Sequence, residues 1–293
     1  MEVALQQVET LIVVDDETRL AHALRLARGF ALFFVRCNVP LYRAKVAERL
    51  KRALPRPIVE VDLTGKPEVY PAIADAAESS SEDAVLFIYG LEAHLPSAAQ
   101  ERALQTLRGL NWQRAAYQRL ERPLVFWLSE YALTLLAREA PDFYDWNSGV
   151  FELTIPEPIR EALLREALVV SEAEDFLSIP LEGKEARIRL LEGLWEEYEE
   201  KHPAEQRARL RLALQLGELH YSLGRYEEAR RWLTEARRLA QALDDQATMA
   251  QALHRLGALA QAWGDLEGAM RLYQESRAIW ESLGDRQGKA ATL

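Results

Sequence analysis

Short apolar runs alternate with longer amphipathic stretches through the first half of the chain. Runs such as "AVLFIY" and "PLVFWL" are apolar throughout, which is typical of strands buried on both faces. The expected strands are Phe30–Arg36, Ile58–Leu63, Ala84–Tyr89, Leu124–Leu128 and Gly149–Ile155. Helices are expected between them, at about 41–54, 67–79, 97–120 and 130–140. This alternation predicts an α/β fold with a parallel sheet over residues 1–155.

Elements are also expected on either side of this pattern. The stretch "TLIVVDDETRLAHALRLARG" predicts a strand at 10–14 and a helix that Asp15 or Asp16 caps. The segment 156–184 is rich in proline and reads as a linker with one helix at about 158–172. The α/β domain is therefore expected to end near residue 155.

The remaining part of the chain repeats itself at a period of forty residues. Twelve positions are identical between 206–245 and 246–285, where chance would give about three at ordinary composition. In each unit a Leu-Gly pair is followed by a glycine seven residues later and by a small alanine five residues further on. A period of this length indicates stacked helical hairpins, with Gly224 and Gly264 at the turns.

The order of small and large residues resembles the tetratricopeptide repeat family in its longer form. The resemblance covers about 205–293, and an amphipathic stretch from Ile188 to Tyr198 resembles the second helix of a degenerate earlier repeat. An all-α repeat region is therefore expected over 185–293. The family is a generic scaffold, so the resemblance implies protein binding and no particular chemistry.

The resemblance also implies where a partner would bind. In tetratricopeptide arrays the first helix of each unit lines the concave face, which receives an extended peptide or a partner helix. The leucines of the Leu-Gly region, Leu216, Leu219, Leu256 and Leu259, are expected in the core. The expected groove residues are Arg211, Leu214, Glu218, Tyr221, Gln251, His254, Ala258 and Gln261.

The last residues, "GKAATL", resemble the first helix of a further unit. Ala290 and Leu293 repeat Ala250 and Leu253, whereas an array normally ends in a polar capping helix. We therefore expect a chain cut short at its C-terminus, with an exposed apolar end that favours self-association.

The segment "ALFFVRCNVPLYRAKVAERL" has the strand–loop–helix frame of a phosphate-binding loop. Such a loop needs glycines, a lysine and a hydroxyl residue, and this one has neither glycine nor Ser or Thr. The strand "AVLFIYG" likewise ends without a magnesium-binding carboxylate, because Glu92 comes two residues after Gly90. We expect Asn38 to cap the following helix, with Pro40 in its first turn. Asn38, Arg43, Lys45 and Glu92 are the residues that would contact a nucleotide if one bound.

The tract "APDFYDWNSGVFEL" resembles one in bacterial proteins that join an N-terminal P-loop-like domain to tetratricopeptide repeats. The resemblance covers about 29–155, although members commonly carry Trp in place of Tyr144 and Arg near Asn147. It implies a degenerate, P-loop-NTPase-like domain of STAND-like regulatory ancestry. An alternative to a pure scaffold is therefore a nucleotide-dependent signalling switch with an unconventional site.

A third hypothesis is a phospho-receiver domain. Asp15 and Asp16 follow an apolar run, and Asp62 lies where a phosphoacceptor would fall. A receiver also needs a hydroxyl residue and a lysine after its last two strands, and those places hold Gly90 and Ser129-Glu130. Two of the four functional positions therefore disagree with this hypothesis.

Composition and charge argue against several classes of function. A net charge of −10 argues against a nucleic-acid surface, and no apolar run approaches the length of a membrane span. The single cysteine, Cys37, is expected to be packed, and it fits a reducing cytoplasm. The five histidines show no metal-binding spacing. We expect a cytoplasmic bacterial scaffold protein that binds a protein partner, has no cofactor and is not an enzyme.

Overall fold

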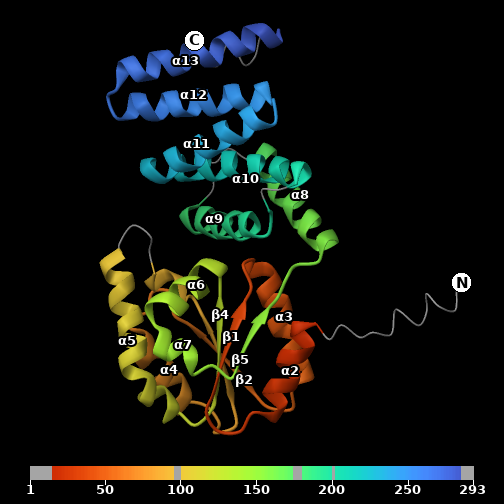
Figure 1. Cartoon of the computed structure of the whole chain (residues 1–293), viewed down its shortest axis with the longest axis vertical. Coiled ribbons are helices and arrows are strands. Elements are labelled where there is room, and N and C mark those ends of the chain that lie inside the picture. The colour runs from red at the N-terminus through yellow and green to blue at the C-terminus, as the bar shows by residue number, and fades with distance from the viewer. Residues whose placement is uncertain (1–14, 96–99, 174–179, 200–201, 285–293) are drawn as a thin grey trace, which may run out of the picture. The chain divides into compact units, whose positions relative to one another are not determined.

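The computed structural model describes residues 15–95, 100–173, 180–199 and 202–284. The chain divides into two compact units, Met1–Thr154 and Ile155–Leu293 (Figure 1). The first unit is built on a sheet, and the second is helical throughout its described residues.

The sheet of the first unit has the strand order β2-β3-β4-β1-β5, and every neighbouring pair is parallel. The strands are β1 (Ala31–Arg36), β2 (Ile58–Asp62), β3 (Val85–Tyr89), β4 (Pro123–Leu128) and β5 (Gly149–Glu152). The five expected strands and the parallel α/β fold are thus confirmed. The last strand was expected to reach Ile155, but it ends at Glu152, which pairs with Arg36 at the end of β1.

Helices cover both faces of this sheet (Figure 1). They are α2 (Asp16–Leu26), α3 (Pro40–Ala53), α4 (Val69–Glu78), η1 (Leu91–His94), α5 (Gln100–Gln118), α6 (Glu130–Glu139) and α7 (Pro141–Asp145). The connection from β1 to β2 runs across the sheet in one direction, and the later connections run in the other direction. Because connections between parallel strands are right-handed, α3 lies on one face of the sheet and α4 to α7 lie on the opposite face. On that face α2 joins α3, where Arg49 donates to Glu17 at 2.7 Å.

One helix of this unit starts as the sequence predicts. Asp15 is the N-cap of α2, and its carboxylate accepts the backbone N–H of Thr18 at 2.8 Å. Hydrogen bonds from the Thr18 side chain and then from the Thr18 backbone hold the pKa of Asp15 below its ordinary value. The strand expected at 10–14 lies outside the described residues.

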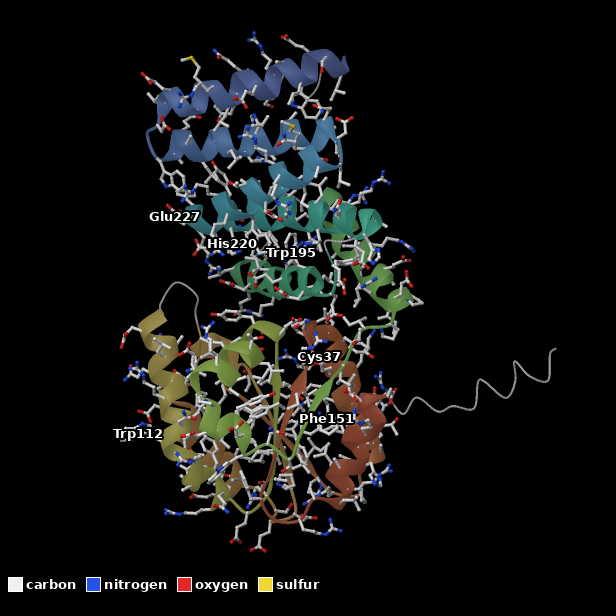
Figure 2. All side chains as sticks on the ribbon, viewed as in Figure 1. Cys37, Trp112, Phe151, Trp195, His220 and Glu227 are labelled. Atoms are coloured by element: carbon white, nitrogen blue, oxygen red, sulfur yellow. The ribbon has the colours of Figure 1, made fainter. Side chains whose placement is uncertain are left out.

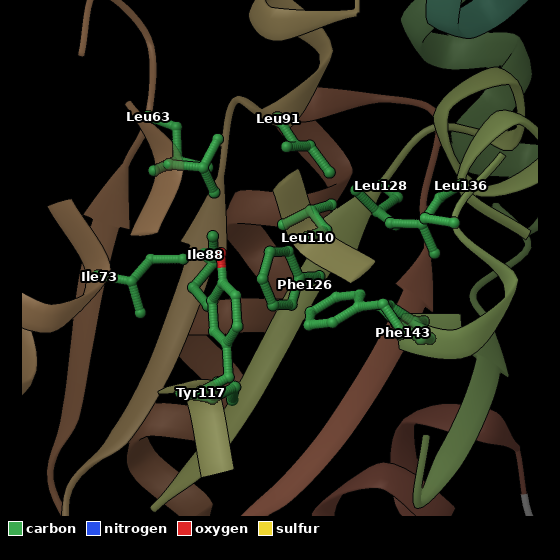
Figure 3. Close-up of a cluster of buried hydrophobic side chains, with 14 of the residues drawn as sticks. Leu63, Ile73, Ile88, Leu91, Leu110, Tyr117, Phe126, Leu128, Leu136 and Phe143 are labelled. Atoms are coloured by element: carbon green, nitrogen blue, oxygen red, sulfur yellow. The ribbon is translucent and has the colours of Figure 1, made fainter. Parts of the chain in front are cut away.

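The larger core of the first unit lies between the sheet and α4 to α7. Its aromatic side chains meet edge to face, with 5.1 Å between the ring centroids of Tyr117 and Phe143 and 5.8 Å between those of Phe126 and Phe143 (Figure 3). Phe126, Tyr117 and Phe143 are fully buried. Such aromatic contacts add to the apolar area that the core removes from water. This core fixes the ends of the strands, from which the loops discussed below emerge.

The second unit is a stack of helices. They are α8 (Glu157–Ala173), α9 (Leu181–Glu196), α10 (Pro203–Ser222), α11 (Tyr226–Ala242), α12 (Gln246–Ala262) and α13 (Leu266–Leu283). The helix expected at 158–172 corresponds to α8. The region expected as a linker, 156–184, also contains the start of α9, which packs against α10.

The repeat pattern corresponds to two helical hairpins, α10–α11 and α12–α13. Gly224 and Gly264 sit at the turns with φ of +70° and +83°, a conformation that only glycine adopts without strain. Leu216, Leu219 and Leu259 are buried, as expected. Leu256 was also expected in the core, but it is only partly buried, where it packs against the residues between α11 and α12.

Candidate functional site

The carboxyl edge of the sheet is the first candidate site. In open parallel sheets ligands bind where the strand order reverses, outside the carboxyl ends of the strands. Here that place lies between β1 and β4, beside Cys37 and Asn38 after one strand and Ser129 and Glu130 after the other. Cys37 is fully buried at the end of β1, as expected (Figure 2).

Two side chains from other loops cap helix α6 at this edge. The side-chain oxygen of Asn38 accepts the backbone N–H of Glu130 at 2.8 Å. The carboxylate of Glu92, from η1 after β3, accepts the backbone N–H of Ser129 at 2.8 Å. Backbone N–H groups at a helix start are the donors that usually bind an anionic ligand. In this protein Asn38 and Glu92 occupy those donors.

The expected role of Asn38 as the cap of its own helix is therefore wrong. Helix α3 begins at Pro40, so the capping position falls on Val39, which has no side-chain oxygen. Asn38 stands one residue too early to reach the first turn of α3. Its side chain is buried and turns to α6 instead.

Arg43 and Lys45, the other two candidates for nucleotide contact, differ in their exposure to solvent. Arg43 is buried, donates to the carbonyl oxygen of Cys37 at 2.8 Å and lies 3.5 Å from the Glu92 carboxylate. Lys45 is exposed on the outer side of α3. The structure thus brings Asn38, Arg43 and Glu92 into one network and leaves Lys45 outside it.

This network joins the loops after β1, β3 and β4, and it places the Arg43 guanidinium beside the Glu92 carboxylate. The guanidinium of Arg43 faces a carboxylate where a phosphate-binding loop would present its cations to phosphate. Gly90, which precedes η1 in this network, must be a glycine. Its φ is +77°, and a Cβ at this position would lie 2.6 Å from the hydroxyl oxygen of Thr64. Chemically, the edge is suited to holding three loops together.

The receiver hypothesis is not supported by the topology. A receiver has the strand order 2-1-3-4-5, in which its phosphoacceptor strand lies beside the strand with the acidic pair. Asp16 lies at the β5 edge, where its carboxylate accepts the backbone N–H of Glu152 at 2.7 Å. Asp62 ends β2 at the opposite edge of the sheet. Four strand spacings separate these edges, about 19 Å, so the acidic residues form no common pocket.

The expected groove residues form the second candidate site, on the first helices of the two hairpins. The two helices are joined where Arg255 of α12 donates to Glu218 of α10 at 3.0 Å. Side chains expected on the groove therefore come from neighbouring helices. Arg211, Gln251 and Gln261 are exposed, whereas Leu214, Glu218, Tyr221, His254 and Ala258 are partly buried.

Several of these groove residues already contact their own fold. Tyr221 packs beside Tyr226, with ring centroids 5.7 Å apart. The ring of His254 lies against Tyr273 of α13 at 5.2 Å, and burial, followed by the nearby Arg255, lowers the pKa of His254. These contacts mean that the middle of the row is held in place. Arg211 and Gln251 are exposed, and the exposed Gln261 accepts a hydrogen bond from the Tyr273 hydroxyl at 3.1 Å.

A polar cluster that sequence reasoning missed lies between α9 and α10. His220 is buried, both of its ring nitrogens lack a hydrogen bond within the described structure, and one lies 3.9 Å from the Glu192 carboxylate. Burial, followed by the charge of Glu185, raises the pKa of Glu192 to about 7. Burial, followed by Arg225, lowers the pKa of His220. No spacing signal links residues 28 positions apart, which is why this pair was not predicted.

Aromatic contacts hold α9 on the same hairpin. Trp195 of α9 meets Trp232 of α11 edge to face, with centroids 5.0 Å apart, and the guanidinium of Arg209 lies 3.8 Å from the Trp195 ring centroid (Figure 2). A cation stacked on an indole at this distance is a favourable contact. Helix α9 therefore covers the side of α10–α11 that faces away from α12.

The repeat geometry agrees with a family comparison. Residues 207–282 match the family model of the tetratricopeptide repeat. The match spans α10 to α13 and supports a general role in protein interaction. A comparison with curated proteins finds no match to the chain.

Within the described residues, no helix is both long and apolar enough to cross a membrane. Within the same residues, no three His, Cys, Asp or Glu side chains gather in a way that could hold a metal ion.

Proposed function

We propose that this chain is a protein-recognition scaffold. Its tetratricopeptide hairpins bind a partner protein or peptide, and its α/β domain carries out no catalysis. The observation that carries the proposal is the row of side chains on α10 and α12, which the Glu218–Arg255 ion pair holds side by side. A mixed polar row with one aromatic residue suits an extended peptide or a partner helix.

The test uses peptide display followed by measured affinity. Random extended peptides selected on the chain are expected to bind with a dissociation constant that calorimetry can measure. Arg211→Glu combined with Gln251→Glu should weaken binding at least tenfold, because both side chains face solvent on the row. The unfolding temperature should stay unchanged. Equal affinity of the variant and the parent chain would place the binding surface elsewhere.

The proposal for the α/β domain is a degenerate P-loop-like domain of STAND-like ancestry, in a bacterial cytoplasmic signalling or defence protein. It is supported by the parallel sheet, by the strand–loop–helix frame from β1 to α3, and by the buried Cys37. The network of Asn38, Arg43 and Glu92 supports a domain that does not bind nucleotide, because its donors are already engaged.

MgATP binding distinguishes this proposal from the nucleotide switch. A ligand that binds only the folded state raises the unfolding temperature by mass action. Millimolar MgATP is expected to leave the unfolding temperature of the chain unchanged. A clear rise that Lys45→Ala removes would favour the switch, and since Lys45 is exposed the substitution should not disturb the fold.

A further inference from the structure

The outer face of α5 carries a tryptophan that is almost fully exposed. Trp112 is 86% exposed, and in Figure 2 it stands on the outer side of the helix. Tryptophan is on average a highly buried residue. The core side of α5 is provided by Leu107, Leu110 and Tyr117, which are buried. Trp112 therefore adds nothing to the core of its own unit.

The neighbours of α5 leave this outer face open. On one side the hydroxyl of Tyr70 in α4 donates to the carbonyl oxygen of Ala116 at 3.5 Å. On the other side the side-chain oxygen of Asn111 accepts the backbone N–H of Phe143 in α7 at 2.9 Å. Both contacts tie α5 to its neighbours, and neither involves the face that Trp112 occupies.

Four exposed residues form a stripe along this face, here called the α5 stripe. They are Arg108, Trp112, Ala115 and Arg119. Their spacing of four, three and four residues places them on one side of a helix. Arg119 directly follows the last residue of α5 and continues its turn, with its N–H bonded to the carbonyl of Ala116 at 3.1 Å. At a rise of 1.5 Å per residue, the two arginines stand about 16 Å apart.

The two arginines give the α5 stripe a positive charge. Neither Arg108 nor Arg119 forms an ion pair within the part of the chain that the structure describes. Glu101 lies two turns before Arg108, at the start of the helix. The stripe is thus a local exception in a chain with a net charge of −10. Tryptophan and arginine are also the residue types most often found to carry the binding energy of protein interfaces.

These charges decide which kind of occupant fits. A second copy that docked through the same stripe in a two-fold contact would bring Arg119 against Arg108, and the like charges would repel. A nucleic acid or an anionic membrane would attract the two arginines, but the net charge of −10 on the chain would oppose its approach. A short acidic segment of a partner protein meets neither difficulty.

We propose that the α5 stripe is a docking surface for an acidic, amphipathic helix of another protein. Apolar side chains of that helix cover Trp112, beside the small Ala115 where the two helices can approach closely. Carboxylates about 16 Å apart on the same helix pair with Arg108 and Arg119. The stripe belongs to the first unit, so the proposal does not depend on the function proposed for the row on α10 and α12.

The probe is a fluorescein-labelled helical peptide built mainly of alanine and glutamine. Glutamate, leucine, leucine and glutamate follow one another in it at steps of four, three and four residues, which matches the stripe. Fluorescence anisotropy with the full chain is expected to show saturable binding with a dissociation constant below about 1 mM, since the contact is small. The same peptide with lysine in place of both glutamates should bind at least tenfold more weakly. Equal binding of the two peptides would overturn the proposal.

Removing the tryptophan locates the contact on the chain. Trp112→Ala should weaken binding of the glutamate peptide at least tenfold. Urea unfolding should be unchanged, because the side chain is exposed. Trp263→Ala removes another exposed tryptophan, from the helical unit, and is the matched control. It should bind the peptide as the parent chain does.

Reversing the charges tests the arginines. Arg108→Glu with Arg119→Glu should lose the glutamate peptide and bind the lysine peptide about as tightly as the parent chain binds the glutamate peptide, because the charge pairs are restored. Arg52→Glu with Arg271→Glu changes the net charge equally at exposed positions elsewhere. At physiological salt, which screens distant charges, this control should leave binding of the glutamate peptide unchanged.

Three results would contradict the assignment. Peptide binding that survives both Trp112→Ala and the charge reversal would place the contact elsewhere on the chain. Phosphatidylserine vesicles that bind through Trp112, with no binding of the peptide, would assign the stripe to a lipid surface. A dimer in sedimentation velocity that Trp112→Ala disperses would assign it to a second copy.

Discussion

Hairpins α10–α11 and α12–α13 share twelve of forty aligned residues, but their surroundings differ. The first hairpin lies between α9 and α12, and within the described residues the second has a neighbouring helix only on the side of α12. Leu233 of the first is fully buried, whereas its counterpart Tyr273 is partly exposed. The comparison teaches that a repeat's sequence specifies the hairpin while its neighbours decide how much of it is buried.

The largest difference in stability between the hairpins is expected at Leu233 of α11 and at the equivalent Tyr273 of α13. Leu233→Ala should lower the free energy of unfolding by about 3 kcal/mol, because it leaves a cavity among buried side chains. Tyr273→Ala should cost about 1 kcal/mol, because part of the ring already faces solvent. Urea unfolding of both variants measures the difference. Equal losses would mean that the two hairpins are buried to the same degree in solution.

The glycines of the two Leu-Gly pairs give the next contrast. A Cβ at Gly217 would lie 2.6 Å from Cγ of the buried Leu233, while one at Gly257 would lie 2.9 Å from the ring of Tyr273. Gly217→Ala should cost about 2 kcal/mol through overpacking. Gly257→Ala should be nearly neutral, because the Tyr273 ring can turn outward and alanine favours the helix by about 1 kcal/mol.

Urea unfolding again provides the measurement for the glycine pair. As a control, Gly217→Ala combined with Leu233→Ala should cost less than the sum of the two single substitutions, because the clash is removed. Additive costs would place the strain of Gly217→Ala somewhere other than Leu233.

A smaller effect is expected from a hydroxyl that only the second hairpin has. Ser276 is fully buried, and its hydroxyl donates to the backbone carbonyl of Ala250 at 2.8 Å. Ser276→Ala should cost about 1 kcal/mol for the lost hydrogen bond. The reciprocal change, Ala236→Ser, should be nearly neutral, since the carbonyl of Leu210 stands at the equivalent place. Thermal unfolding of both variants tests the pair, and a large loss in Ala236→Ser would show that its hydroxyl finds no acceptor.

The smallest effect concerns the polar cluster on the α9 side of the first hairpin. Because the pKa of Glu192 is raised to about 7, its contribution to stability is present at low pH and lost as the pH rises through 7. Glu192→Gln should therefore unfold at a slightly higher temperature than the parent chain at pH 8 and at the same temperature near pH 4. The effect is small because 47% of the side chain reaches solvent.

Two comparisons make the pH test specific. Burial lowers the pKa of His220, so the contribution of His220 to the stability of the fold is lost as the pH falls, which is the opposite direction. This loss occurs in the parent chain and in the Glu192→Gln variant alike. Glu267→Gln changes the net charge equally at an exposed position of α13. If Glu267→Gln reproduces the result at pH 8, the effect comes from net charge and not from the cluster.

Sequence patterns predicted the elements of this fold well, because those patterns are local. Short runs rich in apolar residues gave the five strands, and the forty-residue period gave the paired helices. The cap of α2 at Asp15 also depends on neighbours only three residues apart. Each of these signals is contained within the element that it predicts.

The edge of the sheet was harder to predict, because its contacts join distant residues. Asn38 lies 92 residues from Glu130, and Glu92 lies 37 residues from Ser129. The same local rule that identified Asp15 misplaced Asn38, since the proline at the start of α3 moves the capping position by one residue. The strand order that brings these loops together follows from the packing of the whole sheet.

The double cap of α6 also limits how this domain can evolve. Glu92 accepts the N–H of Ser129, the N-cap of α6, and Asn38 accepts the N–H of Glu130, its first residue. Replacing the loop after β1 with a glycine-rich one would remove Asn38, and a phosphate bound there would meet the carboxylate of Glu92. Each single step towards nucleotide binding first costs stability or creates repulsion, and only the combined change gives a working site. The three loops at this edge of the sheet are thus coupled, so that a change in one of them disturbs the start of α6.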